Sequence, residues 1–171
     1  MCAPTGSGKT AVAAAVIASH LKKREGKGKV VFIVSRVPLA RQQSDHLKSY
    51  LPNLNTAIDY TYGTREVALK AILQTSEIVV CTHGTFYSDL KRNNVKMSDI
   101  SLLVLDECHN ARRASIYAQI MHEYLSAKLS RNENIPQVVG LTATPGAGRS
   151  KEIALSDVPV SYTHLTLPTK A

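Results

Sequence analysis

A glycine-rich loop at the start of the chain constrains the fold more than any other feature. The segment Ala3–Thr10 reads Ala-Pro-Thr-Gly-Ser-Gly-Lys-Thr and runs directly into an Ala-rich helical stretch. Glycines let backbone N–H groups approach phosphate oxygens closely, and the helix N-terminus adds partial positive charge. Lys9 can then reach the β- and γ-phosphates, and the Thr10 hydroxyl can ligate magnesium. We therefore expect an ATP and Mg²⁺ site at Pro4, Thr5, Gly6, Ser7, Gly8, Lys9 and Thr10.

Strand and helix patterns alternate along the rest of the chain. Short apolar runs are typical of buried strands, and longer amphipathic stretches between them are typical of helices. This alternation predicts an α/β fold with a doubly wound, mostly parallel sheet. The predicted strands are Val30–Ser35, Thr56–Tyr60, Glu77–Cys81, Ser101–Leu105 and Gln137–Leu141, and the predicted helices are Thr10–Lys22, Leu39–Tyr50, Arg65–Gln74, Thr85–Lys91 and Ile116–Leu129.

Two carboxylates follow the apolar run that ends at Leu105. A strand delivers them to the carboxyl edge of the sheet, where open α/β sheets bind ligands. Asp106 would hold magnesium, and Glu107 would orient and deprotonate an attacking water. His109 completes an Asp-Glu-x-His box, although a lone histidine is usually structural. After the next strand, Thr142 and Thr144 could hydrogen-bond this loop and relay its state, although that segment alone indicates only a turn.

The net charge of the chain is +8 at pH 7, which favours a polyanionic partner but also fits a basic surface without one. Three segments with hydroxyl, basic or glycine residues could contact phosphates and sugars, and the pattern fits ordinary β–α connections equally well. The candidate nucleic-acid contacts are Ser35, Arg36, Gly63, Thr64, Thr82 and His83. No apolar run reaches the roughly 18 residues of a membrane span. The three cysteines are odd in number and lack the close paired spacing of a zinc site. A reducing compartment, most simply the cytoplasm, is therefore expected.

The motifs together resemble those of superfamily 2 DExD/H-box RNA helicases. Pro4–Thr10, Asp106–His109 and Thr142–Thr144 look like helicase motifs I, II and III in the order of that family. Three stretches are most similar to the RIG-I-like receptor and Dicer-related branch: Asp106–Asn110, Tyr117–Leu125 with Lys128-Leu129, and Pro136–Ala143. The resemblance covers about residues 1–148 and implies a RecA-like P-loop NTPase lobe.

That resemblance implies an RNA-dependent ATPase that senses double-stranded RNA in antiviral innate immunity. It implies that the RNA backbone meets Ser35–Pro38, Gly63-Thr64 and Thr82–Thr85, with recognition by shape and 2′-hydroxyls. Many relatives have Thr-Pro-Gln where this chain has Thr82-His83-Gly84, so the third contact departs from the family pattern. Hydrolysis would need a second RecA-like lobe of the same parent chain, and this chain alone should be nearly inactive. The alternatives are a Dicer-type helicase lobe in RNA processing, a DNA translocase lobe and a non-catalytic interaction fragment.

The two ends of the sequence lead to separate expectations. A strand should feed a phosphate loop, yet only three residues precede this one, so we expect an N-terminally truncated domain. We assign residues 1–150 to this incomplete helicase ATP-binding domain and 151–158 to a linker. Residues 159–171 resemble a translated sequencing adapter, which predicts a non-native tail.

Overall fold

A single parallel sheet organises the part of the chain that the computed structural model describes, which is residues 8–59, 69–111, 115–130 and 134–142. Its strands lie in the order β2-β3-β1-β4-β5, and every neighbouring pair is parallel. This confirms the predicted α/β fold with a doubly wound, mostly parallel sheet. The strands are β1 (Val30–Val34), β2 (Thr56–Asp59), β3 (Ile78–Thr82), β4 (Leu102–Leu105) and β5 (Gln137–Gly140).

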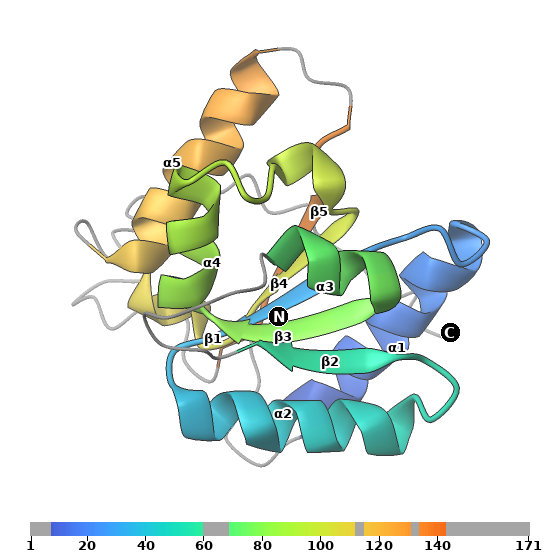
Figure 1. The fold of residues 1–171 in the computed structure, drawn as a ribbon. Coiled ribbons are helices and arrows are strands. Elements are labelled where there is room, and N and C mark those ends of the chain that lie inside the picture. The colour runs from blue at the N-terminus through green and yellow to red at the C-terminus, as the bar shows by residue number, and fades with distance from the viewer. Residues whose placement is uncertain (1–7, 60–68, 112–114, 131–133, 143–171) are drawn as a thin grey trace, which may run out of the picture.

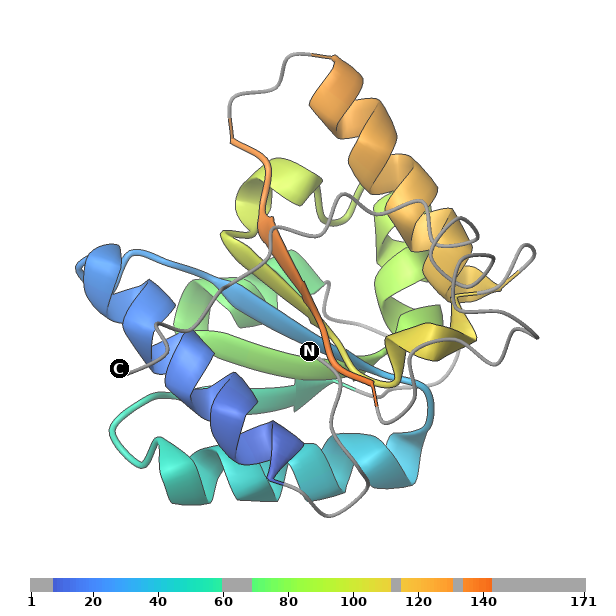
Figure 2. The same cartoon turned by 180° about the vertical axis from the view of Figure 1, so that it is seen from behind.

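Helices cover both faces of the sheet (Figures 1 and 2). The first two helices lie on one face and the other three on the opposite face, as expected where parallel strands are joined by helical crossovers. The helices are α1 (Lys9–Lys23), α2 (Val37–Tyr50), α3 (Leu69–Thr75), α4 (His83–Lys91) and α5 (Ile116–Leu129). Two short 3₁₀ helices that the sequence did not predict are η1 (Met97–Asp99) and η2 (Cys108–Asn110). No described helix is both long and apolar enough to cross a membrane.

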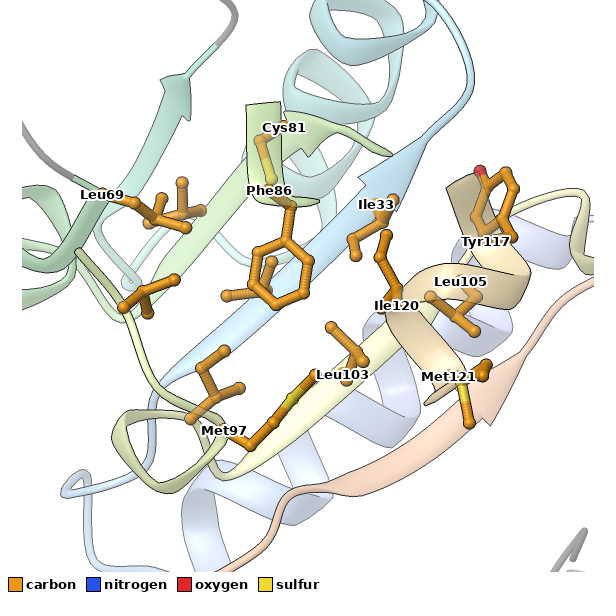
Figure 3. Packing of buried hydrophobic residues seen from close by; sticks show 14 of the residues in the cluster. Ile33, Leu69, Cys81, Phe86, Met97, Leu103, Leu105, Tyr117, Ile120 and Met121 are labelled. Atoms are coloured by element: carbon orange, nitrogen blue, oxygen red, sulfur yellow. The ribbon is translucent and has the colours of Figure 1, made fainter. Parts of the chain in front are cut away.

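The strands alternate their side chains between two hydrophobic cores. Val31 and Ile33 of β1 pack with α3, α4 and α5, whereas Phe32 of the same strand packs with α1 and α2. Phe86 lies in the middle of the first core, as Figure 3 shows. Because both faces are covered, β1 is buried at every position, which explains its unbroken apolar sequence. Full burial of one such large side chain contributes about 1.5–3 kcal/mol.

Most predicted elements are confirmed, with shifted ends. Helix α4 begins two residues before its predicted start because the Thr82 side chain accepts a hydrogen bond from the backbone N–H of Thr85 and caps the helix. Helix α2 also begins two residues early, with Pro38 in its first turn, where a missing N–H costs nothing. The start of the predicted helix Arg65–Gln74 lies outside the described residues, as do the predicted linker 151–158 and tail 159–171.

At the amino edge of the sheet, Ser101 connects three elements. Its Oγ accepts a hydrogen bond from the backbone N–H of Lys29 at 2.9 Å and lies 2.9 Å from His20 Nε2 at the end of α1. The chain passes Ser101 closely at Gly28, where an added Cβ would lie 2.8 Å from Leu21 Cδ2 and 3.0 Å from Ser101 Oγ. This edge is therefore tightly packed, and the polar side chains described next lie at the opposite, carboxyl edge.

Candidate functional site

The glycine-rich loop joins helix α1 directly at Gly8. Gly8 has φ 78° and ψ 23°, a left-handed conformation that glycine adopts without a steric penalty. Its carbonyl accepts a hydrogen bond from Val12 N at 3.1 Å, so the helix follows at once with Lys9 and Thr10 in its first turn. The other predicted residues of this loop, Pro4, Thr5, Gly6 and Ser7, lie outside the described residues.

Hydrogen bonds to its backbone and to its side chain hold Asp106 in place directly after β4. The residue is buried, and its backbone N–H donates to Ile33 O at 2.9 Å. Its Oδ1 accepts from Glu107 N at 3.0 Å, and its carbonyl accepts from the Tyr117 hydroxyl at 2.9 Å. Tyr117 comes from α5, and its ring is buried in the core shown in Figure 3. The carboxylate therefore has a defined orientation at the carboxyl edge of the sheet.

Gln43 of α2 connects the two halves of the site. The Thr10 hydroxyl donates to Gln43 Oε1 at 2.9 Å, and Gln43 Nε2 donates to Asp106 Oδ2 at 3.4 Å. One side-chain amide thus joins two residues far apart in sequence, one in helix α1 and the other directly after strand β4. Hydroxyl and carboxylate oxygens are the hard ligands that Mg²⁺ prefers, which it usually combines with phosphate oxygens and water. The donor set fits a magnesium–nucleotide complex.

The site carries an electrostatic preference for a cation. Burial raises the pKa of the Asp106 carboxyl, and the neighbouring Glu107 carboxylate raises this pKa further. The Glu107 backbone N–H and the positive charges of Lys9 and His109 act in the opposite direction. Lys9 is therefore close enough to stabilise the carboxylate electrostatically, and a bound cation would add to this stabilisation.

The loop after Asp106 has an unusual backbone and a dense set of contacts. Glu107 adopts φ 50° and ψ 44°, a left-handed conformation that costs a non-glycine residue about 1–2 kcal/mol. His109 Nδ1 lies 3.1 Å from Glu107 Oε2 and 3.0 Å from Thr142 Oγ1. Cys108 N also donates to Leu141 O at 2.9 Å. The structure thus brings Glu107, His109 and Thr142 together, whereas Thr144 lies outside the described residues.

The candidate nucleic-acid residues have different surroundings. Arg36 is exposed in extended backbone just before α2, next to the half-buried Ser35. Thr82 caps α4 with its hydroxyl, and the His83 ring packs edge-on against Tyr117 with centroids 5.2 Å apart. Burial lowers the pKa of His83, so its ring favours the neutral form. Gly63 and Thr64 lie outside the described residues.

The sequence motifs did not identify Gln43 or Tyr117. Gln43 lies on the stripe of α2 that also carries the buried residues Ala40, Ser44 and Leu47. A polar residue three positions after one core residue and four before another faces inward on a helix, and that spacing was a usable signal. Tyr117 belongs to a stretch that carries the family resemblance, but nothing in it indicated a role at the site, because an aromatic residue on a core helix is ordinarily a packing residue.

Comparison with known proteins gives one family and several relatives. Residues 1–153 match the family model described as DEAD/DEAH box helicase. The chain is 34% identical over 157 residues to "Antiviral innate immune response receptor RIG-I" of Homo sapiens, a match that covers 88% of this chain and 17% of the relative. It is 33% identical over 156 residues to "ATP-dependent RNA helicase DHX58" of Mus musculus, covering 88% of this chain and 23% of the relative. It is 32% identical over 162 residues to "Protein Dicer" of Schizosaccharomyces pombe, covering 85% of this chain and 12% of the relative. The chain therefore spans less than a quarter of the length of each of these proteins.

Proposed function

Because the chain belongs to the DEAD/DEAH box helicase family, we propose that it is the ATP-binding, RecA-like lobe of an RNA-dependent ATPase that senses double-stranded RNA in antiviral innate immunity. The observation that carries the nucleotide-binding part of this proposal is the connection of Thr10 to Asp106 through Gln43 at the carboxyl edge of the sheet. The identity to the antiviral receptor supports the sensing role.

Each polar residue of the site has a chemical task in this proposal. Lys9 and the N–H groups at the start of α1 bind phosphate oxygens, and Thr10 and Asp106 hold Mg²⁺. The metal, when bound, neutralises the negative charge of the phosphates. Glu107 orients the attacking water and accepts its proton.

Hydrolysis in this proposal depends on parts of the protein beyond this lobe. The contact of His109 with both Glu107 and Thr142 supports a role in relaying the state of the site to the neighbouring strand. A second RecA-like lobe of the same parent chain supplies the arginine finger, a group that raises rates by about 10³–10⁵ elsewhere. This lobe alone is accordingly nearly inactive.

The proposed RNA surface lies along the same edge of the sheet. Arg36 is exposed at the start of α2, and the net charge of +8 favours a polyanion. Contacts of this kind read the shape and the 2′-hydroxyls of double-stranded RNA, with little sequence information. Ser35, Thr82 and His83 belong to the same proposed surface, whereas Gly63 and Thr64 are proposed RNA contacts outside the described residues. The proposed location of the parent protein is the cytoplasm.

A second function has comparable support. The identity to the yeast Dicer is 32%, close to the 34% found for the human receptor, so a Dicer-type helicase lobe in RNA processing fits this chain as well. The full-length transcript separates the two functions: a pair of ribonuclease III domains after the helicase would favour the Dicer type. Their absence would favour the sensor.

A Glu107→Gln substitution in the full-length protein tests the proposed chemistry. We expect ATP binding to persist and RNA-stimulated turnover to fall by about 10²–10⁴-fold, the usual contribution of a general base. Lys9→Ala should weaken ATP binding itself.

Glu123→Gln is the matched control, because Glu123 forms a surface ion pair with Lys91 at 3.3 Å and has no assigned role in the chemistry. Normal turnover in the Glu107 variant would remove this residue from its role, and stimulation by duplex DNA but not duplex RNA would favour a translocase.

A further inference from the structure

The amide of Gln43 contacts both proposed magnesium ligands without blocking either. The Thr10 hydroxyl donates its proton to Gln43 Oε1 at 2.9 Å, which leaves the lone pairs of the hydroxyl oxygen free for a cation. Gln43 Nε2 donates to Asp106 Oδ2 at 3.4 Å, and a carboxylate oxygen can accept this bond and still bind a metal. The two bonds orient both ligands, and they are compatible with a metal bound between them.

The backbone that carries Gln43 is held firmly. Ala40, Ser44 and Leu47 flank it on the inward stripe of α2, and all three are completely buried. Two of them belong to the hydrophobic core between the helices α1 and α2 and the sheet. The Gln43 side chain is itself only half buried, so it reaches from a fixed base into the site. A residue so placed can impose an orientation on Thr10 and Asp106.

We propose that Gln43 is a positioning residue for the magnesium site: its amide orients the Thr10 hydroxyl and the Asp106 carboxylate so that both face the metal of a bound nucleotide. This inference rests on the proposed function, because it assumes that Thr10 and Asp106 bind Mg²⁺. Partners that orient metal ligands in this way typically change metal affinity by 10–100-fold when they are removed.

Magnesium-dependent nucleotide binding by the full-length protein tests the proposal. Gln43→Met keeps the length and helix propensity of the side chain and removes both hydrogen bonds. Binding of a fluorescent, non-hydrolysable ATP analogue is titrated with MgCl₂, beginning in EDTA. We expect the Mg²⁺ concentration at half-maximal binding to rise by about 10-fold or more, with unchanged affinity in EDTA. Gln42→Met is the matched control, since Gln42 is exposed on the same helix, and it should titrate like the wild type.

The outcomes separate this inference from the proposed function. If wild-type binding depends on Mg²⁺ and Gln43→Met titrates like the wild type, the positioning role is refuted and the proposed function stands. If Gln43→Met weakens binding equally in EDTA and in Mg²⁺, the positioning role is also refuted. If wild-type binding depends on neither Mg²⁺ nor Lys9, both proposals fail. Gln43→Ala gives a second measurement with the same expected shift should the methionine variant not fold.

Discussion

Removal of the Tyr117 hydroxyl should loosen the loop that carries the acidic residues. The ring is almost fully buried, and the hydroxyl donates to the backbone carbonyl of Asp106 at 2.9 Å. Tyr117→Phe keeps the packing of the ring and leaves this carbonyl without that donor. An unsatisfied buried acceptor costs about 1–3 kcal/mol, which corresponds to about 5- to 150-fold in the equilibrium for local opening.

Hydrogen exchange measures this local opening in the full-length protein. The peptide covering residues 102–111 should exchange about 5- to 150-fold faster in Tyr117→Phe, because backbone amides exchange through such openings. The matched control is Tyr124→Phe on the same helix, which removes a hydroxyl from a partly buried ring without touching Asp106. Unchanged exchange in Tyr117→Phe, or equal acceleration in the control, would show that the hydroxyl does not hold the loop.

Three further predictions concern stability. Gly28→Ala should lower the thermal unfolding temperature, because the added Cβ would lie too close to Leu21 and Ser101, and overpacking of this kind costs about 1–3 kcal/mol. An unchanged unfolding temperature in scanning fluorimetry would contradict the close approach of the chain at Gly28. The second prediction concerns His20, whose pKa is lowered by burial, so that the unfolded chain binds a proton at this residue more readily than the folded chain does. The contribution of His20 to stability is therefore complete above about pH 6.5 and is lost as the pH falls. The loss of thermal stability between about pH 6.5 and 5 should therefore be smaller in His20→Asn than in the wild type, and equal losses would count against the assigned sign. Ser115→Ala removes the cap of α5 and should cost about 1 kcal/mol, visible as faster hydrogen exchange in the first turn of that helix and not in its last.

The sequence predicted the elements well because local patterns decide them. The helix Ile116–Leu129 has the same ends in the structure, and the Val30–Ser35 strand differs by one residue. Apolar runs of the right length are enough to identify a buried strand. In the structure Ser115 caps α5, which agrees with the predicted start at Ile116. The earlier start of α4 was missed because Thr82 was assigned to the connection before a helix starting at Thr85, whereas its side chain caps a helix that starts at His83.

Long-range contacts were beyond such patterns. The placement of β1 between β3 and β4 depends on packing across the whole sheet, which no local window contains. The site motifs predicted that Thr10 and Asp106 share one magnesium site, but the amide between them comes from a third segment, at Gln43, which those motifs do not include. The hydrogen bond from Tyr117 to the Asp106 carbonyl likewise depends on how α5 lies over the sheet.

Asp106 receives bonds from both sides of the sheet. The amide of α2 reaches its carboxylate from one helical layer, and the hydroxyl of α5 reaches its carbonyl from the other. A slide of either layer against the strands would therefore stretch a bond to the same residue. The position of Asp106 therefore depends on how both helical layers are aligned with the sheet. A displacement of either layer would disturb a hydrogen bond to this one residue.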